Sequence, residues 1–334
     1  MKDRERRRIK EGIGKMKVLI TGRLPEDILA SIKREHEVEY NEKDIPMSRD
    51  LILEKVVDKD GILSMITDRI DKELMDKAPN LKIIANFGVG FNNIDVEYAT
   101  KKGIMVTNTP GVLTDSTADI AMALMLSVCR RIIEGDRMTR EGRFRFWAPM
   151  HFLGREMSGK TLGIIGLGRI GMAVSKRAKG FDMQIFYFKR KRLSEEEEAK
   201  LSVRYLPLDE LLKSSDFVSL HVPLTSETYH LIGERELSLM KPTSCLINTA
   251  RGPVVDEKAL IKALKEGWIA GAGLDVYENE PEVPEELKEM HNVVLLPHIG
   301  SATEETRYRM AEMAARNLLT ALRGEIPPNC LNKV

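Results

Sequence analysis

The stretch TLGIIGLGRIG, Thr161 to Gly171, decides the fold of this chain. Its first five residues are mostly apolar and predict a buried strand, and a glycine-rich turn of the form GxGxxG follows directly. A helical pattern then runs from Met172 to Lys179, and we expect Gly180 to end it before the next strand begins. Strand, turn and helix together predict a βαβ unit that binds the pyrophosphate of a dinucleotide.

The three glycines of the turn have different expected roles. Gly166 permits the tight turn, Gly168 lets the backbone approach the pyrophosphate, and Gly171 allows the helix to pack closely on the strand. The helix N-terminus offers free N–H groups and the positive end of its dipole to the phosphates. We therefore expect the pyrophosphate to be bound by Leu167, Gly168, Arg169, Ile170 and Gly171.

On both sides of this unit, short apolar runs alternate with helical periodicity, which predicts α/β architecture with parallel sheets. The fingerprint lies in the middle of the chain, so a complete α/β domain is expected before it. Long helical segments at 114–131 and 302–323 are expected to connect two sheets. The expected strands are KVLIT, VEY, GILSMI, LKIIANF and IMVTNT in the first half, and TLGIIG, MQIFYF, DFVSLHV, SCLINT, GAGLDV and NVVLLP in the second.

Composition limits the classes of function. The 334 residues are 43% apolar and 31% charged, with a formal charge of +1, so we expect a globular protein that binds neither nucleic acid nor membrane. The first fifteen residues have no apolar segment typical of a secretory signal, and we expect them to be a solvated tail. Three well-separated cysteines, Cys129, Cys245 and Cys330, predict a reducing, cytoplasmic environment and no metal site.

Three residues with suitable chemistry follow strands of the second half. Arg251 follows SCLINT, Glu280 comes shortly after GAGLDV, and His298 follows NVVLLP, so all three are expected at the edge that binds the dinucleotide. A guanidinium can bind a substrate carboxylate and polarise its carbonyl group. A histidine can donate a proton, and a carboxylate beside it stabilises its protonated form. This set suits reduction of a 2-keto acid.

The residues alone leave alternatives open. His221, in HVPLT, is expected at the same sheet edge and competes with His298 as the proton donor. Arg251 could instead form a salt bridge with Asp275, and Glu280 could be merely solvated before Pro281.

The motifs NTARG, VDEKALIKALKEG, AGAGLDVYENEP and LLPHIGSAT resemble those of the D-2-hydroxyacid dehydrogenases. With NFGVGFNNID, NTPGVLTDSTAD and HVPLTSETYHLI, the chain from Met16 onward is most similar to the glyoxylate/hydroxypyruvate reductase branch. The resemblance implies that Arg251 binds substrate, Glu280 pairs with the histidine and His298 donates the proton.

The resemblance also implies further site residues. The backbone of Val89 and Gly90 would bind the substrate carboxylate, and Thr228, Thr249, Ala250 and Asp275 would line the nicotinamide half of the site. The remaining expected cofactor contacts are His221, Val222, Pro223, Arg251, His298 and Gly300.

The domain organisation follows from the same resemblance. A flavodoxin-like substrate domain at 16–108 and 299–334 would be interrupted by a Rossmann domain at 109–298, and residues 1–15 would be the flexible tail. A homodimer would form around the long helix after Thr114 and the arm RFRFWAPMHFLG. In this branch an aromatic side chain from the arm enters the partner's pocket, and here that position is His151.

The segment FYFKRKR, Phe186 to Arg192, bears on the choice of cofactor. Relatives that prefer NAD have an acidic residue after this strand, and it would repel a 2′-phosphate. The basic residues here predict that NADP(H) is preferred, with NAD(H) possible, although a solvated basic turn would have the same sequence. The expected phosphate contacts are Lys189, Arg190, Lys191 and Arg192.

The same fold also supports other functions. D-lactate, phosphoglycerate or phosphite oxidation would keep the fold and change the substrate, but phosphoglycerate specificity usually comes with an extra C-terminal domain. Formate dehydrogenases have Gln at the position of Glu280. A cofactor-sensing corepressor would keep the catalytic residues and would carry extra peptide-binding segments.

Overall fold

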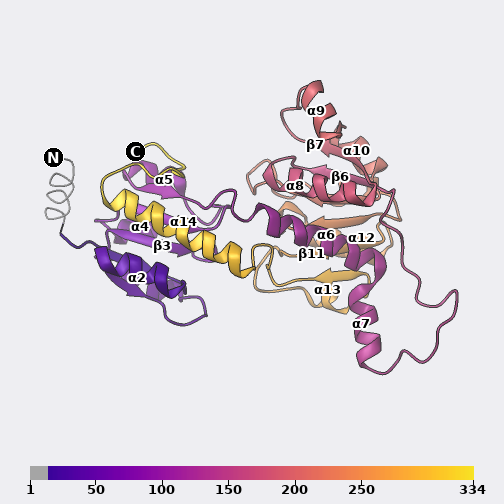
Figure 1. Ribbon diagram of the computed structural model, residues 1–334, viewed down its shortest axis with the longest axis horizontal. Coiled ribbons are helices and arrows are strands. Elements are labelled where there is room, and N and C mark those ends of the chain that lie inside the picture. Colours follow the sequence, from indigo (N-terminus) through magenta and orange to yellow (C-terminus); the bar gives the residue numbers. More distant parts are fainter. Residues whose placement is uncertain (1–13) are drawn as a thin grey trace. The chain divides into compact units, whose positions relative to one another are not determined.

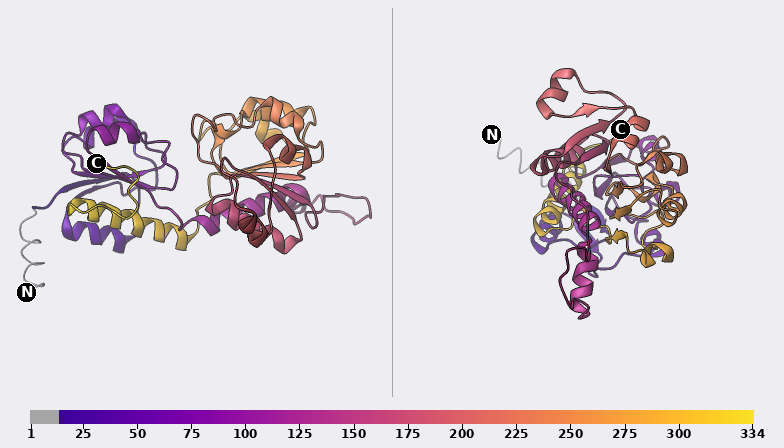
Figure 2. Two further views of the ribbon diagram at one scale, coloured as in Figure 1. Left: turned by 90° about the horizontal axis from the view of Figure 1, so that it is seen from above. Right: turned by 90° about the vertical axis from the view of Figure 1, so that its right-hand side faces the viewer.

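The computed structural model describes residues 14–334, and the chain divides into two units. One unit comprises residues up to Val112 together with Thr303–Val334, and the other comprises Leu113–Ala302. The predicted tail at 1–15 lies outside the described residues except for Gly14 and Lys15, which are exposed. In each unit, helices cover both faces of one parallel sheet (Figures 1 and 2).

The described part of the first unit contains a five-stranded sheet in the order β2-β1-β3-β4-β5. Every neighbouring pair is parallel, and the order is that of the flavodoxin-like doubly wound fold. The strands are β1 (Lys17–Ile20), β2 (Glu37–Tyr40), β3 (Gly61–Met65), β4 (Ile83–Phe87) and β5 (Met105–Thr107). The helices are α2 (Glu26–Glu35), α3 (Arg49–Lys55), α4 (Lys72–Lys77), α5 (Val96–Lys101) and α14 (Glu304–Leu322).

Short polar side chains set where several of these helices begin. Ser48, Asp71 and Asp95 precede α3, α4 and α5, and each side chain accepts a hydrogen bond from the backbone N–H three residues later. Helix α14, from the far end of the sequence, packs against strands β3 and β4 and against helix α2. The C-terminal segment is therefore part of the first unit, as Figure 1 shows by colour.

The second unit contains a seven-stranded parallel sheet in the order β12-β11-β10-β9-β6-β7-β8. The strands are β6 (Thr161–Ile165), β7 (Gln184–Phe188), β8 (Arg204–Tyr205), β9 (Phe217–Leu220), β10 (Cys245–Asn248), β11 (Gly271–Leu274) and β12 (Val293–Leu295). The helices are α6 (Thr114–Arg130), α7 (Ile132–Arg140), α8 (Arg169–Ala178), η1 (Lys179–Phe181), α9 (Glu195–Leu201), α10 (Leu208–Ser214), α11 (Glu234–Leu239), η2 (Gly252–Val254), α12 (Glu257–Lys265) and α13 (Glu285–Glu289).

Two helical layers bury this second sheet. Helices α6 and α8 pack on one face, and α10, α11 and α12 pack together on the other (Figure 2, left). Strand order reverses at β6, which lies between β7 and β9. In open α/β sheets, ligands bind outside the carboxyl ends of the strands at such a reversal.

The predicted fold class, two doubly wound parallel sheets, is confirmed, and some local predictions need correction. Helix α8 begins at Arg169, and the chain continues past Gly180 as the 3₁₀ turn η1. The turn ends at Asp182, which is left-handed with φ of 55°, so Gly180 is not the stop. Strand β8 was not predicted because two residues carry no periodicity.

Candidate active site

The glycine fingerprint of the second unit has the geometry of a phosphate cradle. Gly166 has φ of +97°, and a Cβ there would lie 2.6 Å from the carbonyl oxygen of His221. A Cβ on Gly171 would lie 2.4 Å from the Gly166 carbonyl oxygen, whereas one on Gly168 would meet nothing within 4 Å. Gly168 precedes the first turn of α8, and no side chain caps that turn. Its open backbone therefore fits a bound pyrophosphate.

His298 and Glu280 form a close pair at the carboxyl edge of the same sheet. Strands β11 and β12 are neighbours, so the loops that follow them bring both residues to one place. The imidazole Nδ1 of His298 lies 2.7 Å from Oε2 of Glu280, and Oε1 of Glu280 accepts a hydrogen bond from the Tyr277 N–H at 3.1 Å. Burial acts to raise the pKa of Glu280, but the hydrogen bond and charge of His298 outweigh it and lower that pKa.

Asp275 shapes the turn that carries His298. The backbone of His298 is left-handed, with φ of 55°, and the next two N–H groups turn toward the Asp275 carboxylate. Ile299 and Gly300 each donate to it at 2.7 Å. Burial raises the pKa of Asp275, and the two hydrogen bonds act against that shift. Asp275 therefore fixes the backbone from which the imidazole projects.

Arg251 follows β10 and is held near the same edge. Its Nη1 donates to the Ala250 carbonyl at 2.7 Å, and Asn248 Nδ2 donates to the Arg251 carbonyl at 3.0 Å. A Cβ on Gly252 would lie 1.8 Å from the Tyr277 carbonyl oxygen, so only glycine lets this loop pack against the segment leading to Glu280. Burial lowers the pKa of Arg251, and the charge of Glu280 opposes that shift. An arginine remains charged even so.

His221, the rival histidine, has a different environment. It follows β9, and its Nε2 lies 2.8 Å from the Ser219 hydroxyl. Burial lowers its pKa to about 3, so the ring is neutral near neutral pH. Its buried Nδ1 and the buried Thr249 hydroxyl have no hydrogen-bond partner within the described residues. Both unsatisfied groups lie at carboxyl ends of strands, where a dinucleotide binds in this fold.

The residues of the basic segment after β7 differ in their hydrogen-bond partners. Arg190, Lys191 and Arg192 are all exposed, and Arg192 forms two hydrogen bonds with Glu198, at 2.7 and 3.0 Å. The buried Glu198 carboxylate also accepts from the Tyr187 hydroxyl at 2.7 Å. The hydrogen bond from Arg192 is the main cause that lowers the pKa of Glu198 to about 2. The guanidinium of Arg192 is therefore held toward α9.

A loop after β9 is closed by its own side chains. The Thr228 hydroxyl accepts from the Thr225 N–H at 2.8 Å and donates to the Pro223 carbonyl at 2.6 Å. Two residues farther on, His230 Nε2 lies 2.8 Å from Glu278 Oε1, which ties this loop to the segment after β11. This second histidine–carboxylate pair was not predicted, and no spacing in the sequence distinguishes it.

Val89 and Gly90 lie in the loop after β4, in the first unit. Both are partly exposed, and their carbonyl oxygens accept hydrogen bonds from the side chains of Asn108 and Asn86. No pattern in the sequence distinguishes these two asparagines from others.

An arm of the second unit exposes several large apolar side chains. Trp147 and Met150 are each 79% exposed, and the ring of His151 lies 4.9 Å from that of Phe146. Helix α7 and this arm project from their unit (Figure 1). Exposed apolar groups concentrated in this way are typical of an interaction surface.

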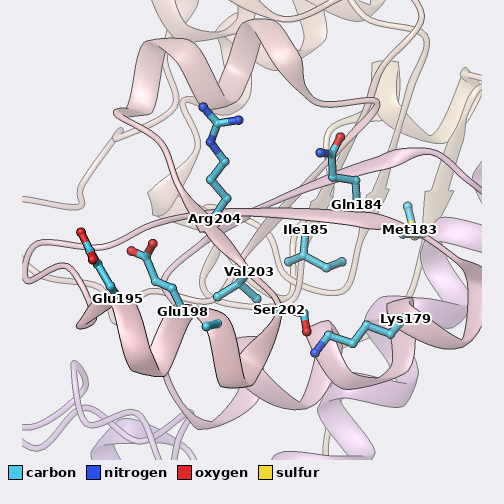
Figure 3. A pocket seen from close by; sticks show the side chains of 10 residues that line it. Lys179, Met183, Gln184, Ile185, Glu195, Glu198, Ser202, Val203 and Arg204 are labelled. Atoms are coloured by element: carbon cyan, nitrogen blue, oxygen red, sulfur yellow. The ribbon is translucent and has the colours of Figure 1, made fainter.

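A hollow of about 470 Å³ lies elsewhere, beside α9 at the edge of the second sheet. Figure 3 shows Glu195 and Glu198 projecting from α9 on one side, with Arg204 and Lys179 among the other lining residues. None of the expected cofactor residues lines it. It is therefore separate from the candidate site.

Two further features concern metals and membranes. Among residues 14–334, histidine, cysteine and acidic side chains do not gather in threes in a way that could hold a metal ion. Within the same residues, every helix is too short or too polar to cross a membrane.

Known proteins with similar sequences and structures identify the family. Residues 122–300 match the family described as D-isomer specific 2-hydroxyacid dehydrogenase, NAD binding domain. A glyoxylate reductase from Thermococcus litoralis is 57% identical over 323 residues, which cover 96% of this chain and 97% of that protein. One from Pyrococcus furiosus is 55% identical, with 96% of each chain covered.

Solved structures agree with the sequence matches. The NADPH-dependent glyoxylate/hydroxypyruvate reductase from Sinorhizobium meliloti, solved with NADP and malonate, has a TM-score of 0.86 and 35% identity. The match covers 95% of this chain and 97% of that one. The chain therefore belongs to the D-isomer-specific 2-hydroxyacid dehydrogenase family, in its glyoxylate reductase branch.

Proposed function

We propose that this enzyme reduces glyoxylate or hydroxypyruvate to the corresponding 2-hydroxy acid with NADPH, and that His298 donates the proton. The observation that supports this most directly is the contact of 2.7 Å between His298 and Glu280, which follow strands of the same sheet that carries the cofactor fingerprint. The relatives that are 54–57% identical to this chain are named glyoxylate reductases.

Three side chains have different roles in the proposed reaction. Arg251 binds the substrate carboxylate and polarises the carbonyl group that is reduced. The bound cofactor supplies the hydride to the carbonyl carbon. Nε2 of His298 gives a proton to the carbonyl oxygen, while Glu280 at Nδ1 stabilises the protonated ring. His221 is a poorer donor because burial keeps its ring neutral.

The cofactor is proposed to be NADP(H) by preference, with NAD(H) as a weaker alternative. Lys189, Arg190 and Lys191 can face a 2′-phosphate, whereas Arg192 is held by Glu198 and contributes mainly to the shape of the loop. The Sinorhizobium relative is named as NADPH-dependent, which supports the same preference. The other proposed cofactor contacts are Leu167, Gly168, Arg169, Ile170, Gly171, His221, Val222, Pro223, Thr228, Thr249, Ala250, Arg251, Asp275, His298 and Gly300.

The first unit is proposed as the substrate domain, and the second as the dinucleotide domain. We assign the carboxylate-binding backbone to Val89 and Gly90 in the loop after β4. The proposed boundaries are 16–108 with 299–334 for the substrate domain and 109–298 for the dinucleotide domain. The units seen in the structure meet a few residues farther on, at Val112 and Thr303.

A homodimer is proposed on the exposed apolar arm that carries Trp147, Met150 and His151. A reducing, cytoplasmic setting is proposed because Cys129, Cys245 and Cys330 are all unpaired.

A panel of 2-keto acids tests the proposed function. Glyoxylate, hydroxypyruvate, pyruvate and phenylpyruvate would each be supplied with NADPH and with NADH, and cofactor oxidation followed by absorbance. We expect glyoxylate or hydroxypyruvate to give the highest kcat/KM, with NADPH ahead of NADH. Faster turnover of pyruvate than of both would instead indicate a D-lactate dehydrogenase.

A further inference from the structure

Three consecutive carbonyl groups in the loop after β4 are each held by a hydrogen bond. The Thr109 N–H donates to the Gly88 carbonyl at 3.0 Å, and Asn108 Nδ2 donates to the Val89 carbonyl at 2.8 Å. Asn86 Nδ2 donates to the Gly90 carbonyl at 2.8 Å. The donors come from β4 and from the residues directly after β5, so all of them belong to the first unit.

The two asparagine side chains are themselves fixed. Asn86 is 0% exposed and Asn108 is 7% exposed, so each amide sits among packed neighbours. The Asn108 carbonyl accepts a hydrogen bond of 3.1 Å from Asn317 on α14. Burying an amide side chain costs free energy unless its N–H groups form hydrogen bonds, and here the loop carbonyls accept them. The pair therefore defines the orientation of the loop.

The orientation of these carbonyl groups also determines where the N–H groups of the loop point. In a trans peptide the carbonyl and the following N–H point in opposite directions. The carbonyls of Gly88, Val89 and Gly90 point toward donors on Thr109, Asn108 and Asn86 respectively. The N–H group that follows each carbonyl, on Val89, Gly90 and Phe91, therefore points away from that donor. Within residues 14–334 these three N–H groups have no acceptor. Successive free N–H groups of this kind form an anion-binding concavity.

We infer that Asn86 and Asn108 are positioning residues for substrate recognition. They hold the loop so that its N–H groups, including that of Phe91, are directed at the carboxylate of the 2-keto acid. The inference rests on the proposed function, because it takes the substrate carboxylate as the anion. It adds that affinity for the substrate depends on two buried amides that never touch it.

Asn108→Asp tests the inference most directly, because it keeps the side-chain shape and replaces the donor by an oxygen. The carboxylate repels the Val89 carbonyl, and the peptide that presents the Gly90 N–H loses its orientation. We expect the KM for glyoxylate to rise about 10–100-fold, as for loss of one or two hydrogen bonds to a charged group. The kcat at saturating glyoxylate and the Kd for NADPH should stay within about twofold, since loss of uniform binding raises KM alone.

Asn332→Asp is the matched control. Asn332 is also an asparagine of the first unit whose Nδ2 holds a backbone carbonyl, that of Ile104 at 2.8 Å, but it does not contact the loop. We expect Asn332→Asp to lower Tm about as much as Asn108→Asp does, but to leave the KM for glyoxylate unchanged. A rise in KM in Asn108→Asp alone then reflects positioning of the loop and not general destabilisation. Asn108→Ser, whose hydroxyl is too short to reach Val89, provides a second variant should Asn108→Asp not fold.

Binding of oxamate, an unreactive isostere of the keto acid, gives a readout without turnover. With NADPH present, we expect its Kd to rise in Asn108→Asp by the same factor as KM. An unchanged KM and an unchanged oxamate Kd, in a folded variant of an enzyme that does reduce glyoxylate, would overturn the inference. A parent enzyme that reduces no 2-keto acid would instead overturn the proposed function.

Discussion

Nδ1 of His298 lies 2.7 Å from Oε2 of Glu280, and this contact fixes which nitrogen of the ring remains for substrate. With Nδ1 engaged by the carboxylate, Nε2 is the nitrogen that can donate a proton elsewhere. The pair arises because β11 and β12 are neighbours, and because Asp275 holds the two N–H groups that follow His298. Substitutions at the pair and around it therefore have specific expected consequences.

Glu280→Gln should alter the pH profile of reduction. The folded protein lowers the pKa of Glu280, so its carboxylate stays ionised at and below the pH where a free glutamate takes up a proton. That charge favours the protonated imidazole, and its removal should move the alkaline fall in kcat/KM to lower pH. Glu278→Gln, at the other histidine–carboxylate pair, should leave the alkaline limb in place. Equal profiles for parent and Glu280→Gln would contradict this role.

Arg251→Lys should impair substrate use and spare the cofactor. A lysine keeps the positive charge but cannot reproduce the planar, two-pronged contact with a carboxylate. We expect kcat/KM for glyoxylate to fall by at least about tenfold, which corresponds to about 1.4 kcal/mol, with little change in the Kd for NADPH. Arg177→Lys, at a surface ion pair with Asp119, is the control and should change neither quantity. Unchanged kcat/KM in Arg251→Lys would remove this residue from the substrate site.

The double variant Lys189→Asp/Arg190→Ala should shift the enzyme from NADPH toward NADH. The parent should prefer NADPH by roughly tens- to a thousandfold in kcat/KM, the effect of about two charged hydrogen bonds to the phosphate. Added salt should weaken the preference, because the basic segment is exposed. Arg192→Met is the comparison, and it should change the ratio less because Arg192 is held by Glu198. Equal efficiencies in the parent would contradict the assignment.

Glu198→Gln should lower stability in a pH-dependent way. The folded protein lowers the pKa of Glu198 from 4.5 to about 2, so its ionised form stabilises the fold above about pH 4.5. This contribution is lost as pH falls toward about 2, where the carboxylate takes up a proton. The difference in Tm between parent and Glu198→Gln should therefore be largest near neutral pH and shrink through this window. A constant difference would show that ionisation of Glu198 does not matter.

The sequence was sufficient to predict the architecture because each strand is short, apolar and separated from the next by a periodic helix. The glycine fingerprint predicted which edge of the second sheet binds the cofactor. Parallel strands then brought Arg251, Glu280 and His298 to one edge by topology alone.

Contacts that depend on packing could not be predicted in this way. His221 and His298 both follow strands, and the sequence does not distinguish them. In the folded protein His221 is buried and neutral, whereas His298 is paired with Glu280. Arg190 and Arg192 are two residues apart and both exposed, yet Arg192 is held by the buried Glu198 of helix α9. No local pattern encodes such partners, because they come from another element of the fold.

Turnover of glyoxylate with NADPH by the parent and by His298→Asn is the most direct test of the proposed mechanism. Asparagine tolerates the left-handed backbone at this position, so the turn held by Asp275 should persist. We expect kcat to fall about 10²–10⁴-fold, the usual contribution of a general acid, with an unchanged Kd for NADPH. His221→Asn serves as the comparison; because His221 is a proposed cofactor contact, this change should raise the KM for NADPH but leave most of the kcat at saturating NADPH. Near-native kcat in His298→Asn together with its loss in His221→Asn would contradict the assignment of His298 as the proton donor.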